Sequence, residues 1–437
     1  MDKIYLINPP SDFLIDDKSN MPLGLLFLHA HLQNNDIEVE IIDLAGLKPE
    51  EWVIPDGGFI YGITATTPQF EAACKIAEKI KINGGIAILG GVHATCVPED
   101  SLKYGKFDIV VVGEGETTML ELAQNKKALD EIPGLYYWSG GEIVSTGLRV
   151  FEKKIDSFSH PIIDAIDYKS YNCGVFTTAD GDMVSGAQII TSRGCPGKCS
   201  FCCSPHIYRR KVRFHTTEYV ENWVDYLNGY GYNTFYVVDD TVLLNSNRLR
   251  KMCDIFKSRE SRWRACVRGD AVTLEKMEML YDSGCRQVDI GVESGSQKVL
   301  DLVQKGERVE DNINAVNIAH SVGIKVKSCL IVGLPGEEQE DIDLTVDFIE
   351  KCAPDSVTLC TFIPFPGCDI FFNPDKYNYK VDHSKGYSKY VCCGADAMAE
   401  SVAVKEENEK IVSFRRQLLN AIKDRSTNAT LKNRNTD

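Results

Sequence analysis

The sequence predicts an α/β protein with two sheets. A doubly wound, Rossmann-like amino-terminal domain precedes a partial (β/α)6 barrel of the TIM type and a small carboxyl-terminal extension. Short apolar segments alternate with helical patterns in two series, which is typical of parallel sheets. The length of 437 residues also exceeds the usual length of a domain with a single hydrophobic core. We expect domains at residues 1–125 and 186–370, a connecting segment at 126–185, and a cap and tail at 371–437.

The first series predicts the amino-terminal domain element by element. Apolar runs predict five strands, at residues 4–10, 37–44, 59–67, 86–94 and 108–116. Helical patterns lie between or after them, at residues 22–35, 71–84 and 117–124. Ligands on such open sheets bind outside the carboxyl ends of the strands. The glycine pair Gly90–Gly91 and the GEGE stretch at 113–116 therefore mark a candidate site.

The connecting segment and the second series follow. GLYYWSGGEI, residues 134–143, predicts a small hairpin. Six further strands are expected at 187–195, 234–242, 263–272, 287–296, 325–337 and 356–367, with helices such as 217–231 and 274–284 after the earlier ones. Polar or glycine-rich residues end each of these strands. Because barrel chemistry lies at the carboxyl ends of strands, we expect a site there. A last helix is expected near 405–424.

Composition limits the class of protein. The formal net charge of −15 disfavours a general nucleic-acid binder. The start, MDKIYLINPP, lacks a signal-peptide layout, and no apolar run reaches the length of a membrane span. We therefore expect a cytoplasmic protein. Its sixteen cysteines are then reduced thiols, a few of which serve as metal ligands.

The strongest motif is TSRGCPGKCSFCCSP, residues 191–205. Cys195, Cys199 and Cys202 have the spacing C-x3-C-x2-C on a glycine- and proline-containing loop directly after a predicted strand. Three thiolates on an iron–sulfur cluster would leave one iron open for a ligand, whereas four would close it. Structural zinc is the alternative, with Cys203 or His206 as a fourth ligand, although zinc ligands usually come in C-x2-C pairs. Cys203 follows Cys202 immediately, so we expect a packed free thiol there.

At these residues the sequence resembles the radical S-adenosylmethionine (SAM) enzymes, over about residues 186–370. Phe201, an aromatic residue before the last cysteine, belongs to the same pattern. The resemblance implies a 4Fe–4S cluster on Cys195, Cys199 and Cys202, with SAM chelated to the open iron and cleaved to a 5′-deoxyadenosyl radical. It also implies SAM contacts at the strand ends. Asp239 and Asp240 would meet the amino group of SAM, and Arg268 would meet its carboxylate. Glu293 and Ser294 would meet the ribose, and Val332 and Leu334 would pack against the adenine. A helix cap or a salt bridge at the barrel rim is the alternative for each.

The amino-terminal domain resembles the cobalamin-binding domain of one radical SAM class. TATT at 64–67 followed by Gly90–Gly91 is similar to the S-x-L…G-G pattern of such domains. The resemblance then covers about residues 4–370. The loop after the first strand carries no D-x-H-x-x-G motif, so it supplies no histidine to cobalt. Implied cobalamin contacts are Thr64, Thr66, Gly90, Gly91, His93, Gly113 and Glu114. The alternative for His93 is a buried structural histidine, and the GEGE acids would also suit the first turn of a helix.

The resemblance implies a cobalamin-dependent radical SAM enzyme that methylates an unactivated carbon of a small molecule. The second hypothesis is a radical SAM enzyme that cyclises, rearranges or oxidises its substrate. The third is an iron–sulfur or cobalamin sensor. No hydrolase, P-loop or H-E-x-x-H motif is present. A flavodoxin- or ferredoxin-type protein is the expected electron donor. Aromatic residues in 370–400 line a substrate pocket or pack a cap, and the Cys392–Cys393 pair matches no ferredoxin pattern.

Overall fold

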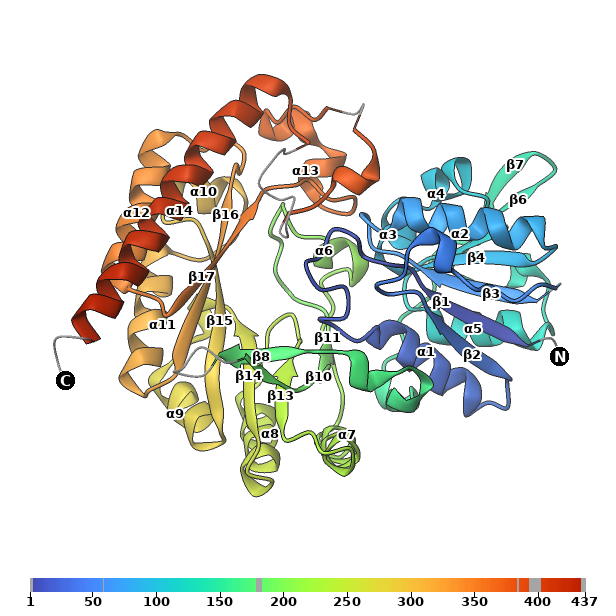
Figure 1. Ribbon diagram of the computed structural model, residues 1–437, viewed down its shortest axis with the longest axis horizontal. Coiled ribbons are helices and arrows are strands. Elements are labelled where there is room, and N and C mark those ends of the chain that lie inside the picture. Colours follow the sequence, from blue (N-terminus) through green and yellow to red (C-terminus); the bar gives the residue numbers. More distant parts are fainter. Residues whose placement is uncertain (1–2, 58, 178–182, 383–384, 393–401, 434–437) are drawn as a thin grey trace.

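The structure is a computed structural model of the chain. It describes residues 3–57, 59–177, 183–382, 385–392 and 402–433. Two sheets lie side by side, with β11 (Ser192–Arg193) and the short helix α6 (Ser204–Ile207) between them (Figure 1). No described helix is long and apolar enough to cross a membrane.

The first sheet has the strand order β2-β1-β3-β4-β5-β6-β7. Its parallel strands are β1 (Ile4–Asn8), β2 (Val39–Asp43), β3 (Ile60–Thr64), β4 (Ile86–Gly90) and β5 (Ile109–Val111). Helices α1 (Leu23–Gln33), α2 (Phe70–Ile82), α3 (Gly91–Cys96), α4 (Pro98–Tyr104) and α5 (Gly115–Gln124) connect or follow them. The reversal of strand order between β1 and its neighbours β2 and β3 makes the sheet doubly wound, as predicted.

Two features of this sheet differ from the prediction. The chain turns into helix α3 at Gly91, so the expected strand 86–94 ends at Gly90. The predicted hairpin forms, as β6 (Leu135–Ser139) and β7 (Glu142–Ser145), and β6 pairs antiparallel with β5. The first sheet therefore reaches residue 145, into the segment expected to be a connection. Sequence patterning does not reveal this pairing because it depends on which strand edge the hairpin meets.

The second sheet is parallel and has the order β10-β13-β14-β15-β16-β17. Its strands are β10 (Ala187–Ile189), β13 (Thr234–Val237), β14 (Arg262–Val267), β15 (Cys285–Glu293), β16 (Lys325–Val332) and β17 (Ser356–Thr361). The helices are α7 (Thr217–Gly229), α8 (Ser246–Ser258), α9 (Leu274–Asp282), α10 (Gln297–Leu302), α11 (Val309–Ser321) and α12 (Gln339–Cys352). Among the described strands, β10 and β17 do not pair with each other, so the six-stranded barrel is partial, as predicted.

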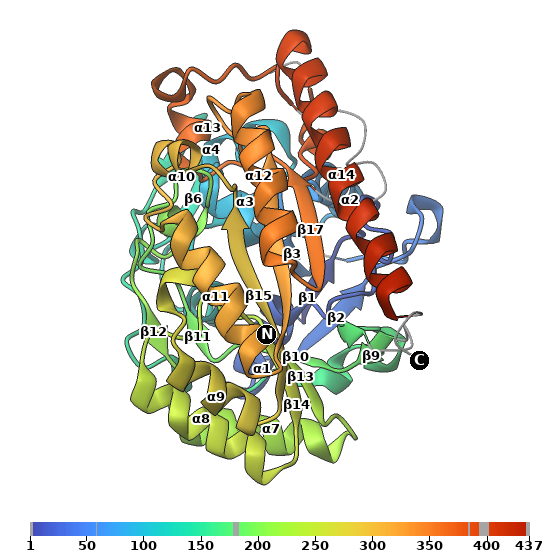
Figure 2. The ribbon, with the colours of Figure 1, turned by 90° about the vertical axis from the view of Figure 1, so that its left-hand side faces the viewer.

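Smaller elements surround the barrel. Strands β8 (Gly174–Thr177) and β9 (Met183–Ser185) form one antiparallel pair, and β11 forms another with β12 (Arg213–Phe214). Helix α13 (Asp369–Phe372) follows the last barrel strand. The long helix α14 (Lys405–Asn433) runs beside α12 and β17 (Figure 2). It extends beyond the expected range of 405–424.

One hydrophobic core joins the two domains. It contains buried residues of α1 and α5 together with residues of α7 and the barrel strands. Phe27 of α1 meets Trp223 of α7 edge to face, with ring centroids 5.5 Å apart. Because packed aromatic pairs of this kind fix relative orientation, the mouth of the barrel is held against the carboxyl ends of the first sheet's strands.

Candidate active site

The cysteine loop lies between the two strands of the β11–β12 pair. β11 ends at Arg193, and β12 returns the chain at Arg213, so the loop is closed at its base by this pairing. A methyl group placed on Gly197 would lie 3.3 Å from Cys195 Sγ and 3.8 Å from Cys199 Sγ, so both thiols border one space. Burial raises the pKa of the Cys202 thiol to about 12, and it also raises the pKa of Cys199. Burial thus favours the neutral form of these two thiols, whereas a bound metal would favour the thiolate form.

Cys203 points elsewhere. Its Sγ lies 3.3 Å from the carbonyl oxygen of Pro366, and its side chain packs in an apolar cluster with Phe201 and Leu334. This is the packed thiol that the sequence predicted. Cys392 is half-buried, and Cys393 lies outside the described residues.

The two aspartates after β13 differ in their surroundings. Asp239 is 2% exposed and accepts hydrogen bonds from the Thr191 amide, the Thr191 hydroxyl and the Ser192 hydroxyl. It therefore fixes the strand that enters the cysteine loop. Asp240 is exposed and accepts a hydrogen bond from the Ser204 hydroxyl, directly after the loop. Of the two, Asp240 has the carboxylate that can reach a ligand.

A buried group of charges lies beside Cys199. Lys305 Nζ is 2.8 Å from Glu293, and Arg268 is 3.0 Å from Glu307 and bonded to Asp270. Burial opposes the charge of Lys305, but Glu293 and Glu307 outweigh it and raise its pKa. Burial raises the pKa of Glu307 to about 7 despite the two neighbouring cations. The predicted residues Arg268 and Glu293 thus belong to one network.

Backbone strain accompanies this network. Glu293 has φ of 63°, in the left-handed region, where the register with β16 shifts at the end of β15. A non-glycine residue in that region costs of order 1–3 kcal/mol and persists where the surroundings fix it. The ion pair with Lys305 and the shifted register supply that constraint here.

The remaining predicted SAM residues are buried. Ser294 is 0% exposed, and its hydroxyl accepts from the Ser296 amide and lies 3.4 Å from Thr345 Oγ1. Val332 ends β16 inside the main core, while Leu334 packs with Phe201. Ser294 therefore shapes a turn, and Val332 and Leu334 form the apolar floor behind the strand ends.

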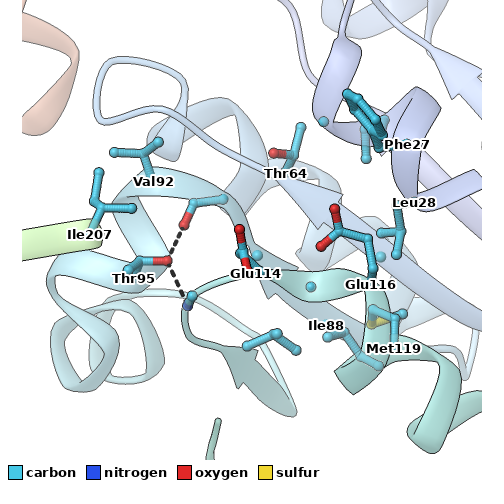
Figure 3. Close-up of a pocket in the computed structure, with 18 of the residues that line it drawn as sticks. Phe27, Leu28, Thr64, Ile88, Val92, Thr95, Glu114, Glu116, Met119 and Ile207 are labelled. Atoms are coloured by element: carbon cyan, nitrogen blue, oxygen red, sulfur yellow. Dashed lines mark hydrogen bonds between the residues drawn. The ribbon is translucent and has the colours of Figure 1, made fainter. Parts of the chain in front are cut away.

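An apolar cavity of about 260 Å³ lies at the carboxyl ends of β3, β4 and β5 (Figure 3). Arg193 of β11 also lines it. Phe27, Leu28, Ile88 and Met119 supply much of its wall. The Thr95 hydroxyl donates to the Gly91 carbonyl at 2.8 Å and accepts from the Gly113 amide at 3.0 Å, which ties α3 to the loop after β5. The cavity therefore has a fixed rim on the side of the barrel.

Five predicted cobalamin residues line this cavity: Thr64, Gly90, Gly91, Gly113 and Glu114. Thr66 and His93 do not. Thr66 donates its hydroxyl to Gln69 within a turn. His93 is 0% exposed and packs between the rings of Phe70 and Tyr387, at centroid distances of 4.1 and 4.7 Å. Burial lowers its pKa to about 3, so it is a neutral structural residue.

A buried ion network joins the two domains at the cavity rim. Arg193 of β11 binds Glu114 at 3.0 Å and Glu116 at 2.8 Å, and Arg213 of β12 binds Glu114 at 2.7 Å. Burial disfavours the charge of Arg193, but Glu116 and Glu114 outweigh it and raise its pKa. The guanidinium also lies over the Phe27 and Phe158 rings. Arg193 is therefore shared by the cavity and the cysteine loop.

Sequence reasoning missed Arg193, Glu116, Phe27 and Tyr208, which also line the cavity. The sequence does show the acidic residues of the GEGE stretch. Their partner Arg193, however, lies 79 residues from Glu114 and 77 from Glu116, and so leaves no local sequence signal.

The residues present fit the two cofactor types. Three thiols on one loop suit an iron–sulfur cluster, and the acidic and basic strand ends suit an amino-acid ligand at an open iron. A Cβ added at Gly90, Gly113 or Gly115 would meet nothing within 4 Å, so the backbone there is open to a bulky group. The apolar cavity beside these glycines suits a planar or aromatic ligand group.

These sites define an enzyme with an iron–sulfur cluster at a barrel mouth and a second large cofactor facing it. A family model described as Radical SAM superfamily matches residues 189–349, and one described as B12 binding domain matches residues 19–123. The chain belongs to the cobalamin-binding radical SAM family. It is a radical SAM enzyme, and its cofactors are a 4Fe–4S cluster, SAM and cobalamin.

The relatives agree with this assignment. The chain is 30% identical to "Uncharacterized methyltransferase PH0819" of Pyrococcus horikoshii over 391 residues, which cover 84% of this chain and 82% of that protein. It is 24% identical to "Cytidylyl-2-hydroxyethylphosphonate methyltransferase" of Streptomyces wedmorensis, over 88% of this chain and 85% of the relative. The solved structure of the radical SAM methyltransferase TsrM from Kitasatospora setae, with cobalamin and a 4Fe–4S cluster bound, has the same fold, with a TM-score of 0.70 and 18% identity over 85% of this chain and 74% of that one.

Proposed function

We propose that this enzyme methylates an unactivated carbon of a small molecule bound between the barrel mouth and the cobalamin site. The observation that carries the proposal is the position of Arg193, which lines the apolar cavity and directly precedes the cysteine loop. When bound, the cluster and SAM supply a radical that removes a hydrogen atom from carbon, and cobalamin supplies the methyl group.

Each set of residues has a proposed task. Cys195, Cys199 and Cys202 hold the cluster. Asp240 and Arg268 orient the amino and carboxylate groups of SAM, because these charges sit beside the cysteine loop. Glu293 is held for the ribose by Lys305, while Phe201 and Leu334 form the apolar floor. Together these groups fix the reacting atoms and exclude water.

The cobalamin tasks follow from the cavity. Thr64, Gly90, Gly91, Gly113 and Glu114 would form the face that holds the cofactor, and the apolar wall would shield it from water. Gly91 has φ of 92°, and a Cβ there would lie 2.8 Å from Thr64 Oγ1. Glycine at this position therefore lets α3 begin without closing the cavity.

The test requires no substrate. Protein purified without oxygen is supplied with iron, sulfide and hydroxocobalamin, desalted, reduced and mixed with SAM. We expect an iron–sulfur absorption band, retained cobalamin, methylcobalamin with S-adenosylhomocysteine in equal amount, and 5′-deoxyadenosine. Changing Cys195, Cys199 and Cys202 together to alanine abolishes the iron–sulfur band and the 5′-deoxyadenosine. Protein that contains zinc in place of iron after isolation from iron-replete cells would contradict the proposal.

The second candidate is radical chemistry without net methyl transfer. It predicts 5′-deoxyadenosine with no S-adenosylhomocysteine, so the same reaction mixture decides between the two. We further propose that a flavodoxin- or ferredoxin-type protein reduces the cluster in the cytoplasm, where thiols stay reduced.

A further inference from the structure

The segment that carries the cluster ligands has an unusual charge. Residues 183–217 contain no aspartate or glutamate, although the whole chain has a formal net charge of −15. The same segment contains six cations: Arg193, Lys198, Arg209, Arg210, Lys211 and Arg213. Arg193 and Arg213 are used by the buried network with Glu114. The other four have exposed side chains, and we call them the basic patch: Lys198, Arg209, Arg210 and Lys211.

The basic patch is built onto the cysteine loop. Arg210 Nε donates to the Pro196 carbonyl at 3.1 Å. A Cβ added at Gly194 would lie 2.2 Å from the Lys211 carbonyl oxygen, so the turn and the loop pack backbone against backbone. Lys198 lies inside the loop, between Cys195 and Cys199. The patch therefore adjoins the cysteine loop.

The backbone of the patch is strained. Arg209 and Arg210 have φ values of 50° and 58°, which are consecutive left-handed conformations without glycine. Such conformations cost of order 1–3 kcal/mol each and gather where function needs the side chain. Arg209 is steadied by the Phe151 ring, at 4.5 Å from its centroid. Both arginines are exposed and line a hollow of about 740 Å³.

The loop is open to solvent at this face. Pro196 and Lys198 are exposed, while Cys199 is buried beneath them. Two acidic residues of α4, Glu99 and Asp100, line the same hollow as Arg209 and Arg210. An acidic partner is repelled by the net charge of −15 of the whole chain and attracted to the cations of the patch, which favours approach at this loop.

We propose that the basic patch docks a small acidic protein that donates one electron to the cluster. This inference rests on the proposed function, since it requires a cluster on the three cysteines. The donor loses one electron and the cluster gains it, with no bond made or broken. Electron-transfer complexes are small and transient, so four cations at the loop suffice to steer encounter without a large apolar interface.

The test measures cluster reduction rather than turnover. The protein with its iron–sulfur cluster is mixed without oxygen with an acidic flavodoxin in its fully reduced form, and the loss of cluster absorption is followed by stopped flow. The patch variant Lys198→Gln/Lys211→Gln removes two exposed cations. The matched control Lys251→Gln/Lys257→Gln removes two exposed cations from α8. Reduced methyl viologen, which is a small cation, replaces flavodoxin in a parallel series.

We expect the patch variant to be reduced by flavodoxin about tenfold more slowly at low salt, and the control to be unchanged. The difference disappears in 1 M salt, where the screening length is about 3 Å. Methyl viologen reduces all three proteins at the same rate. Equal flavodoxin rates for patch and control variants, or an equal slowing with viologen, would overturn the docking proposal alone. A wild-type chain that holds no iron–sulfur cluster would overturn both proposals.

Discussion

Arg193→Met tests whether the ion network at the cavity rim holds the two domains together. The side chain of Arg193 is 9% exposed and contacts both Glu114 and Glu116. Methionine keeps much of the length and apolar contact with Phe27 but removes the charge. Glu114 retains Arg213, whereas the Glu116 carboxylate, which is 8% exposed, loses the cation that neutralises it.

The expected cost follows from that orphaned carboxylate. Removing one partner of a buried ion pair costs about 3–5 kcal/mol, because the other charge stays buried without compensation. With a urea dependence of about 2 kcal/mol/M, the midpoint falls by about 1.5–2.5 M. The double variant Arg193→Met/Glu116→Gln removes the orphaned charge and should recover a large part of the loss.

The assay is urea unfolding followed by tryptophan fluorescence, since Trp223 lies at the domain contact next to Phe27. Arg250→Met is the matched control, because its ion pair with Glu275 is exposed and contributes little. Cobalamin retention after desalting gives a second readout and should fall in Arg193→Met. The reasoning is refuted if Arg193→Met costs less than about 1 kcal/mol, or if the losses from Arg193→Met and Glu116→Gln simply add.

Three further predictions follow from the site and the core. Cys203→Ser should retain the full iron–sulfur absorption, whereas Cys202→Ser should lose it; equal loss in both would assign Cys203 to the cluster. Gly90→Leu projects a side chain into open space at the cavity and should abolish cobalamin retention while iron content stays constant; retained cobalamin would remove the cavity from the site. Burial lowers the pKa of His215 to about 4, so between pH 7 and 5 the unfolded chain gains a proton that the folded chain does not. Stability should fall by about 2 kcal/mol from this group, measured as urea midpoints at the two pH values. His215→Asn should flatten that dependence, and an unchanged slope would contradict the assignment.

Much of the fold was predictable because its signals are local. The six barrel strands and five amino-terminal strands all occur near the predicted residues, since apolar runs and helical periods are set by adjacent side chains. The C-x3-C-x2-C spacing places three thiols on one loop without help from the rest of the chain. The boundary between β4 and α3 was mistaken because an apolar run does not say where strand becomes helix.

The residues of the candidate site likewise fall into two groups: those that local sequence features place correctly and those whose position depends on tertiary packing. Gly90 and Gly113, at and just after the ends of β4 and β5, were predicted to contact cobalamin, and both line the cavity. Thr66 and His93 were predicted to lie beside them. Instead, the Thr66 hydroxyl donates a local hydrogen bond to Gln69, and the His93 side chain is buried in the core. Which way a side chain points at a strand end depends on the element that packs there, and Tyr387 is far along the chain from His93.

The sequence by itself determined the parallel strands of the two sheets, the spacing of three cysteines on one loop and the family, because each is encoded by residues that are close together in the chain. Only the tertiary structure decided that Arg193 lies at both the cavity and the start of the cysteine loop, and that the backbone of Lys211 packs against Gly194 of that loop. These relations join residues from separate elements, and ion pairing and charge density depend on distance in space rather than distance along the chain.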